Sequence, residues 1–177
     1  MHLEDLFHAL RFAFLILTQQ KELYVLHSAS FLYRGRAFLV SGSSGTGKST
    51  HSALWHDLYQ TPLLNGDLNL LGIRNSIPYA YGLPWCGTSG ICTPKDYPLG
   101  GIIFLKQAAI DQVQSLQPDE KVLHILQRMI SPAWTKELLL RNLHFSEALA
   151  PLIFSCRLYC TKEPSAARTL KAAIDAL

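Results

Sequence analysis

The chain has 177 residues, of which 49% are hydrophobic, and its 16 basic and 13 acidic side chains give a formal net charge of +3. Its length and apolar content fit one folded domain and exclude a disordered chain. The charge excess is small and scattered, so we expect neither nucleic acid nor an anionic membrane as a partner.

The start of the sequence predicts an amphipathic helix over residues 4–19, with its apolar face in the core. Apolar residues recur there at helical spacing: Leu6, Phe7, Leu10, Phe14 and Leu17. Acidic Glu4 and Asp5 precede this stretch and Arg11 interrupts it. A secretory signal instead begins with basic residues, and a membrane span needs about 20 apolar residues. We therefore expect a cytoplasmic protein without a membrane span.

Two strands are expected next, joined by a tight turn at Arg34-Gly35, in the segment YVLHSASFLYRGRAFLVSG. A two-residue turn predicts the pairing of Tyr33 with Arg36, Phe31 with Phe38 and Ala29 with Val40. The same register brings His27 opposite Gly42, because opposed Cα atoms of antiparallel strands lie about 4.5–5.5 Å apart. His27 is then either part of a binding site or a structural histidine bonded to the backbone, and the spacing favours neither.

The glycine-rich loop after these strands is the strongest functional signal. Its residues match the phosphate-loop pattern G-x-x-x-x-G-K-[ST] in full and are followed by Thr50: Gly42, Ser43, Ser44, Gly45, Thr46, Gly47, Lys48 and Ser49. Glycines leave backbone N–H groups free to surround phosphate oxygens, and the helix expected over residues 48–59 adds unpaired donors at its N-terminus. Lys48 would contact the β- and γ-phosphates, and the Ser49 hydroxyl would bind Mg²⁺. A chance match in an ordinary turn is less favoured, because an apolar strand precedes the loop.

A magnesium–nucleotide site also needs a carboxylate near the loop serine, and Asp67 is the candidate. It follows the first strand after the phosphate-loop helix, and it is the only acidic residue between Asp57 and Asp96. The alternative is that Asp67 only completes an Asn-Gly-Asp turn, in which aspartate is common. We favour the binding role, with Ser49 and Asp67 as metal ligands.

The rest of the sequence predicts further strands and then helices. In order, we expect an antiparallel meander over 63–85, a loop over 87–100, a buried strand over 101–107, a helix opening near Pro118, a helix over 134–149, a strand over 152–160 and a helix from Pro164. These elements predict one α/β domain over residues 1–177, with a mixed, largely antiparallel sheet, a phosphate-loop hairpin and flanking helices. Within it we expect an N-terminal helix over 1–20, a nucleotide-binding core over 22–116, and C-terminal helices and a strand over 117–177.

Other residues near the loop carry weaker signals. The segment GLPWCGTSG, residues 82–90, suits a loop that faces a substrate or nucleotide and equally a turn anchored by a buried tryptophan. Arg128 or Arg141 could supply a further phosphate contact, but both are expected to be solvated, and His51 and His56 are expected to be surface or packing residues. The four cysteines are expected to be reduced thiols, and no C-x-x-C pair indicates zinc.

The order of these landmarks resembles that of a known family: the catalytic domain of HPr kinase/phosphorylase and its smaller relatives, which share a core with ATP-dependent phosphoenolpyruvate carboxykinase. The landmarks are His27, the loop over 42–49, the Asp67 segment and the strand PLGGIIFLKQ over 98–107. The segment YGLPWCGTSGI, residues 81–91, is similar to small HPr-kinase-like proteins. The resemblance covers about residues 22–116.

The resemblance implies ATP, Mg²⁺ and transfer of the γ-phosphate to a hydroxyl, usually a serine of a protein or peptide. By position, Lys48 and Ser49 would hold the phosphates and the metal, and His27 would lie near the transferred phosphoryl group. Asp67 matches the second member of an Asp-Asp pair. The catalytic candidates are therefore Asp67, His27 and Lys48, with Asp67 expected both to bind Mg²⁺ and to accept the proton.

Two departures from the family bear on the chemistry. Gly66 stands where the family has the first aspartate of the pair, which is assigned there as the base, and Thr50 replaces a glutamate that is frequent in the bifunctional enzymes. A strict HPr kinase is therefore not expected. The leading hypothesis is a kinase for a serine of a peptide or protein. The alternatives are a kinase for a small hydroxylated metabolite and a nucleotide-binding regulatory module with impaired catalysis. The loop recognises phosphates and not bases, so it does not distinguish ATP from GTP, ADP or pyrophosphate as the donor. A homo-oligomer is possible.

Overall fold

The hairpin at Arg34-Gly35 forms as its sequence predicts. In the computed structural model, which describes residues 3–85 and 89–177, β1 (Tyr24–Tyr33) pairs antiparallel with β2 (Arg36–Ser41). Arg34 and Gly35 both have positive φ, 49° and 72°, which suits a two-residue turn between twisted strands. The expected register is confirmed for its three pairs: Tyr33 with Arg36, Phe31 with Phe38 and Ala29 with Val40.

Helices and further strands surround this hairpin along the described chain. They are α1 (Leu3–Gln20), then after the hairpin α2 (Lys48–Tyr59), β3 (Leu63–Asn65), β4 (Leu68–Arg74), β5 (Ile77–Tyr81), β6 (Tyr97–Gln107), β7 (Gln112–Ser115), α3 (Pro118–Arg128), α4 (Lys136–Leu149), the short 3-10 helix η2 (Ala150–Leu152), β8 (Phe154–Cys160) and α5 (Pro164–Asp175). The helices α3 and α5 begin at the prolines expected to open them, because proline lacks only an N–H that a first helical turn leaves unpaired. Among the described residues, no helix combines the length and apolarity needed to cross a membrane.

The strands form one mixed sheet of eight strands in the described chain, in the order β2-β1-β4-β5-β6-β8-β7, with β3 beside β1. Six pairings are antiparallel, and β6 lies parallel to both β2 and β8. Because β2 pairs with β6 as well as with β1, the strands β1, β4, β5, β6 and β2 close a ring. The expected α/β class with a mixed, largely antiparallel sheet is confirmed.

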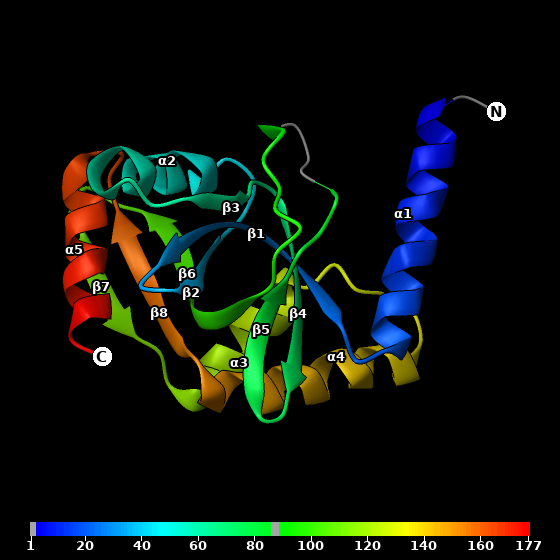
Figure 1. Ribbon diagram of the computed structural model, residues 1–177. Helices are drawn as coiled ribbons and strands as arrows, with labels where there is room; N and C mark the ends of the chain where they lie inside the picture. The colour runs from blue at the N-terminus through cyan, green and yellow to red at the C-terminus, as the bar shows by residue number, and fades with distance from the viewer. Residues whose placement is uncertain (1–2, 86–88) are drawn as a thin grey trace.

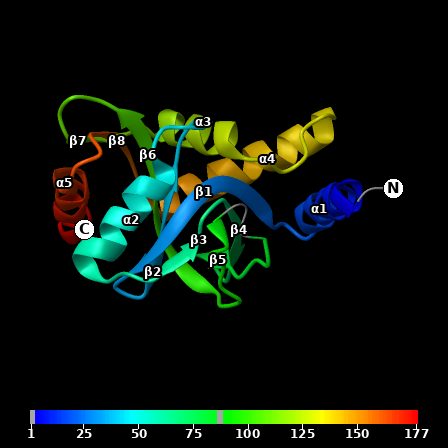
Figure 2. The same ribbon diagram turned by 90° about the horizontal axis from the view of Figure 1, so that it is seen from above.

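Helices cover both faces of the sheet (Figure 1). The helices α2 and α5 lie on one face, and α3 and α4 lie on the other, as the view from above also shows (Figure 2). One core cluster fills each interface, and the two clusters are centred on Trp55 with Leu170 and on Ile125 with Leu149. Since β2, β6 and β8 run parallel, their carboxyl ends meet at one edge of the sheet, which is where ligands bind in open α/β sheets.

The helix α2 is anchored to the hairpin by aromatic packing. Trp55 is fully buried and stacks on Phe31 of β1 with ring centroids 4.3 Å apart. Tyr33 meets the same indole edge to face at 5.1 Å. Because Trp55 lies in the second turn of α2, this contact fixes the helix start, and with it the end of the preceding glycine-rich loop.

The N-terminal helix α1 departs from its expected place. From α1, Phe14 and Leu15 join a small cluster with Val25 and Leu83, and Phe12 stacks on Trp134 with ring centroids 5.1 Å apart. The first half of α1 stands away from the body of the fold (Figure 1). The prediction that its apolar face lies in the core is wrong for four of the five residues that suggested it: Leu6, Phe7, Leu10 and Leu17 are exposed.

One further sequence expectation is wrong, at the start of β6, and the sequence made no prediction for β7. Residues 97–100 were expected in a loop, yet β6 begins at Tyr97, because Tyr97 and Pro98 pair with β5 at the start of the strand. Gly100 permits this course, since a Cβ there would lie 2.6 Å from the Phe38 ring. The strand β7 has no apolar alternation, and it is an edge strand held by β8 alone.

A carboxylate ties the ends of β7, β8 and α5 together. Asp111 accepts hydrogen bonds from the Thr161 N–H at 2.6 Å and from the Ser165 hydroxyl at 2.5 Å. Burial alone would raise the pKa of Asp111, but the hydrogen bonds from Ser165 and Thr161 outweigh it and hold the pKa below its ordinary value.

Asp111→Ala is therefore expected to lower the free energy of unfolding by about 0.5–1.5 kcal/mol at pH 7, because it removes the hydrogen bonds from Thr161 and Ser165, whose donors can then bind water. The contribution is present above the ordinary carboxyl pKa and is lost as the pH falls through the lowered pKa of Asp111. Urea denaturation at pH 7 and pH 3 measures it. Asp57→Ala, on the exposed face of α2, is the control, and equal stability of the two variants at pH 7 would contradict this role of Asp111.

Candidate phosphate-binding site

The glycine-rich loop leaves the end of β2 and turns into α2 with the shape that its glycines permit. Gly42 passes close under the loop, where a Cβ would lie 2.5 Å from the Thr46 hydroxyl. Gly47, at the N-cap of α2, has φ of 98°, which disfavours any other residue there. These two positions are the first and last glycines of the pattern G-x-x-x-x-G-K-[ST].

Hydrogen bonds within the chain hold the loop in this shape. The backbone N–H and the hydroxyl of Thr46 both donate to the Ser43 carbonyl, at 3.3 and 2.7 Å. From the end of β6, the Gln107 amide donates to the Gly45 carbonyl at 3.1 Å. Contacts from Thr46 within the loop and from Gln107 of β6 thus hold the loop carbonyls of Ser43 and Gly45 in place.

The start of α2 offers donors to an anion. No side-chain hydrogen bond caps this helix end, and the first N–H groups of a helix have no partner within the helix. Lys48 lies across the loop, and its Nζ donates to the carbonyls of Gly42 and Ser43 at 3.2 Å each. Burial lowers the pKa of Lys48, and nearby Arg128 lowers it further, whereas Asp67 opposes this shift.

The residues predicted for catalysis and metal binding meet at one hollow of about 360 Å³ beside the loop. It is lined by His27, Ser44, Gly45, Gly47, Lys48, Ser49, Thr50, Gly66, Asp67 and Ser89. The other residues of the predicted phosphate loop, Gly42, Ser43 and Thr46, border a second hollow on the side of α3. The sequence thus predicted a set of residues that the fold brings together from β1, the loop and the turn before β4.

Asp67 is held toward this hollow by an asparagine turn. The Asn65 side-chain oxygen accepts from the backbone N–H groups of Asp67 and Leu68, at 2.9 and 3.0 Å. The Asp67 carbonyl in turn accepts from the Ser28 N–H at 3.0 Å, which ties the turn to β1. The Asn-Gly-Asp turn is therefore present, and it presents the Asp67 side chain to the hollow that Lys48 and Ser49 line.

His27 contacts Asp67 directly. Its Nε2 lies 3.4 Å from Asp67 Oδ1, and both side chains are about one-third exposed. Burial lowers the pKa of His27, and the Lys48 charge lowers it further, although Asp67 opposes the shift. The β1–β2 ladder ends at Ser28 and Ser41, one pair before His27, and the Ser41 hydroxyl donates to the His27 carbonyl at 2.7 Å. The strand register therefore predicted the position of His27 at the mouth of the loop.

Arg128, at the end of α3, reaches the loop although it was expected to be solvated. Its Nη2 lies 3.4 Å from the Ser43 hydroxyl, and its Nε is buried without a hydrogen-bond partner among the described residues. Arg128 and Ser43 border the hollow on the side of α3 together with His124 and Arg157. Arg141 instead pairs with Glu22 and Glu137, as a surface arginine does.

The two histidines of α2 differ from each other. His56 is exposed, whereas His51 is buried and accepts a hydrogen bond at Nε2 from the Trp55 indole at 3.3 Å. Burial lowers the pKa of His51 to about 4, so the ring is neutral at neutral pH. The expectation that these histidines are surface or packing residues is therefore confirmed, because His56 lies at the surface and His51 packs against Trp55.

The segment 82–90 and the cysteines are described in part. Trp85 is half-buried and meets Phe14 edge to face at 4.3 Å, as an anchoring tryptophan would, and Ser89 borders the hollow with Asp67. Cys92, Cys156 and Cys160 are free thiols. Cys86 lies outside the described residues, as do the other residues of 86–88.

The side-chain oxygens at the hollow suit a magnesium ion that also binds phosphate oxygens. Mg²⁺ takes hard oxygen ligands in octahedral geometry, and it usually combines one or two protein oxygens with phosphate and water oxygens. Ser49 and Asp67 would supply two such oxygens. Within residues 3–85 and 89–177, no group of three His, Cys, Asp or Glu side chains is placed to hold a metal ion without such help.

Comparison with known proteins shows a likeness to solved structures. No known protein family matches the sequence, and no curated protein matches it. Among solved structures, the HPr(Ser) kinase/phosphatase from Coxiella burnetii has a similar arrangement of elements, with a TM-score of 0.45 and 10% sequence identity. The match covers 85% of this chain and 98% of that one. The likeness concerns the fold alone.

Proposed function

We propose that this chain is an ATP- and Mg²⁺-dependent kinase that transfers the γ-phosphate to a hydroxyl, most simply a serine of a peptide or protein. One observation supports this above all: Lys48, Ser49, Asp67 and His27 line the same hollow beside an open helix N-terminus. A phosphate loop needs a lysine and a helix end, and phosphoryl transfer additionally needs a metal ligand and a proton acceptor. The serine acceptor follows the family resemblance of residues 22–116.

Each residue has a role in this proposal. The loop amides and Lys48 hold the β- and γ-phosphates. Ser49 and Asp67 would hold Mg²⁺, which would neutralise charge on the phosphate oxygens. The acceptor oxygen attacks the γ-phosphorus, the bond to the β,γ-bridging oxygen breaks, and ADP leaves. The acceptor proton passes to the Asp67 carboxylate, while neutral His27, 3.4 Å from that carboxylate, orients the γ-phosphate.

The fate of the γ-phosphate tests the function. The wild-type chain is incubated with Mg²⁺ and γ-³²P-labelled ATP, with serine-containing peptides, with free serine and with no acceptor. We expect an acid-stable phosphate ester on a peptide serine. Label on free serine would instead indicate that the acceptor is a small hydroxylated metabolite. Nucleotide binding without transfer to any acceptor or to water would contradict the kinase proposal.

A regulatory nucleotide-binding module is the second candidate, and Gly66 favours it. In the family resembled, this position carries the aspartate assigned as base, and here the Gly66 N–H donates to the Ile91 carbonyl at 3.3 Å at the rim of the hollow. If the missing base limits the rate, Gly66→Asp should raise transfer, since a general base typically contributes about 10²- to 10⁴-fold. A wild-type chain that binds ATP but transfers no phosphate would favour this module.

His27→Gln is expected to lower transfer about 10- to 100-fold while ATP affinity stays within about twofold, because the side chain acts on the reacting phosphate and makes no contact that the loop needs. Steady-state kinetics and calorimetry separate the two quantities. His8→Gln, on the exposed half of α1, is the matched control. An unchanged transfer rate in His27→Gln would show that His27 is a structural histidine, the alternative left open by its spacing.

A further inference from the structure

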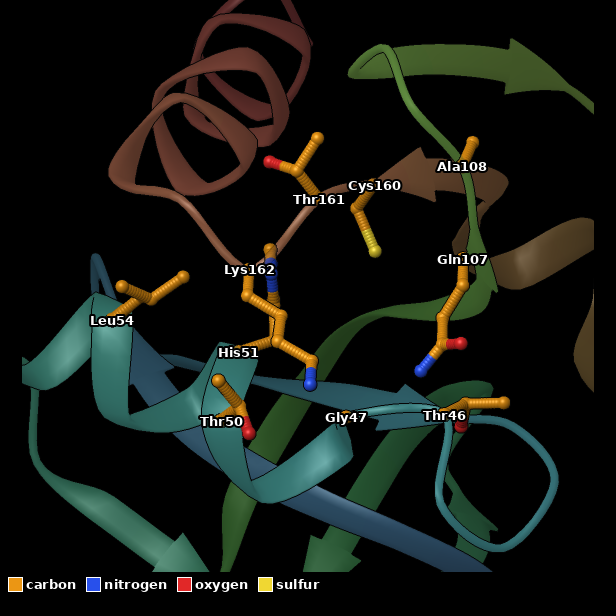
Figure 3. Close-up of a pocket in the computed structure, with 10 residues that line it drawn as sticks. All are labelled: Thr46, Gly47, Thr50, His51, Leu54, Gln107, Ala108, Cys160, Thr161 and Lys162. Atoms are coloured by element: carbon orange, nitrogen blue, oxygen red, sulfur yellow. The ribbon is translucent and has the colours of Figure 1, made fainter.

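A third hollow, distinct from the two described above, adjoins the phosphate loop on the face of the sheet that α2 and α5 cover. It has a volume of about 240 Å³ and lies between α2 and the segments that follow β6 and β8 (Figure 3). Its walls come from three places: the loop end with α2, Gln107-Ala108 after β6, and residues 160–162 at the end of β8. It therefore sits outside the carboxyl ends of parallel strands, the position at which α/β sheets bind ligands.

This hollow is continuous with the site proposed for the phosphates. Gly47 and Thr50 border both it and the hollow that contains Lys48 and Asp67. A ligand whose phosphates lie on the loop can thus extend in either of two directions past the first turn of α2. Since Ser49, Asp67 and His27 lie in one direction, the reacting end of a nucleotide points there, and its other end points toward β8.

The walls of the hollow suit an uncharged, flat group. Leu54, Ala108 and Cys160 contribute apolar surface, and the described lining contains no carboxylate. Lys162 is its one cationic side chain among the described residues, and Figure 3 shows it reaching from the end of β8 toward Gly47, on the phosphate side. Ligand sites of this kind combine apolar walls with a few polar groups that fix orientation.

His51 supplies a polar group without a partner. Because the Trp55 indole donates to Nε2, the neutral ring carries its proton on Nδ1. This Nδ1 is buried and has no hydrogen-bond partner among the described residues. A buried donor left unpaired is unfavourable, and His51 lines this hollow, so an acceptor atom on a ligand that reached Nδ1 would satisfy it. The ring nitrogens of a purine are such acceptors.

We propose that the hollow between α2 and the ends of β6 and β8 binds the purine base of the nucleotide. The proposal rests on the proposed function, since it places the base of the same phosphate donor. The base lies against Leu54 and Ala108, one of its nitrogens accepts from His51, and Lys162 stays near the phosphates at the mouth.

Calorimetric titrations with ADP and with pyrophosphate test this placement, because pyrophosphate occupies the loop without a base. The wild-type chain is expected to bind ADP about tenfold or more tightly than pyrophosphate. Ala108→Trp fills the hollow from the end of β6, and it should weaken ADP to the affinity of pyrophosphate while pyrophosphate binding stays within about twofold. The same substitution one residue on, Ala109→Trp, is the matched control, because Ala109 is exposed and does not line the hollow. ADP and GDP should bind more tightly than CDP and UDP.

Two results would overturn the base site: ADP that binds Ala108→Trp as tightly as the wild type, or wild-type affinities equal for ADP and pyrophosphate. Should Ala108→Trp fail to fold, seen as lost pyrophosphate binding and lost circular dichroism, Leu54→Gln on α2 tests the same wall, and unchanged ADP binding in it also overturns the proposal. Failure of the proposed function looks different. In that case pyrophosphate itself does not bind the wild-type chain, which overturns both the phosphate-binding loop and the base site that depends on it.

Discussion

Asp67→Asn is expected to lower phosphoryl transfer by about 10³-fold or more while the chain still binds nucleotide. The substitution keeps the size of the side chain and the backbone N–H that donates to Asn65, so the turn before β4 persists. It removes the carboxylate charge, and with it both a metal ligand and the proposed proton acceptor. A general base alone typically contributes about 10²- to 10⁴-fold to the rate. Because the metal ligand is lost at the same position, we expect a decrease in the upper part of this range or beyond it.

Transfer rates and ATP affinity must be measured separately for this variant. Single-turnover assays with labelled ATP give the rate, and calorimetry without metal gives the affinity, which we expect within about threefold of the wild type. Asp57→Asn is the control, because Asp57 is an exposed carboxylate on α2, which begins at the phosphate loop. A transfer rate for Asp67→Asn equal to that of the wild type would refute the assignment of Asp67.

Lys48→Ala is expected to weaken ATP and pyrophosphate by about 100-fold or more and to abolish measurable transfer. The Lys48 ammonium lies across the loop and donates hydrogen bonds to the Gly42 and Ser43 carbonyls. A phosphate that binds there would gain a charge-assisted hydrogen bond, which is about twice as strong as a neutral one. The loop itself should persist in the variant, since Thr46 and Gln107 hold its carbonyls independently of Lys48.

Calorimetry with pyrophosphate measures this effect without any contribution from the base. Lys21→Ala, at an exposed position after α1, removes the same charge away from the loop and serves as the control. Circular dichroism shows whether α2 is intact. If Lys48→Ala binds pyrophosphate as tightly as the wild type, the loop is an ordinary glycine-rich turn, the alternative that its sequence pattern allowed.

Local rules predicted the part of the site that lies close in sequence. The two-residue turn fixed the β1–β2 register, and the register carried His27 to the mouth of the loop. Asp67 was expected near the loop because a magnesium–nucleotide site needs a carboxylate and Asp67 is the only acidic residue between Asp57 and Asp96. In the structure, the asparagine turn at Asn65 holds Asp67 in this position. These are short-range features, so propensity and periodicity describe them well.

Contacts between distant segments were not predictable in the same way. Arg128 meets Ser43 from 85 residues away, and the contact depends on how α3 is rotated on the sheet. Similarly, His51 is buried because α2 packs between β1 and α5, which the composition of α2 alone does not reveal. The strand β7 and the first residues of β6 exist through pairing with β8 and β5, and their polar or proline- and glycine-containing sequences favour a loop in isolation.

Manganese resonance tests the central claim most directly, namely that Ser49 and Asp67 hold a metal ion against the phosphates on the loop. Mn²⁺ replaces Mg²⁺, and the wild-type chain is saturated with a non-hydrolysable ATP analogue. We expect the bound Mn²⁺ to show hyperfine coupling to phosphorus, and its affinity to fall about tenfold or more in Asp67→Asn and in Ser49→Ala. Mn²⁺ that binds all three chains with equal affinity, or binds the wild type without phosphorus coupling, would contradict the claim.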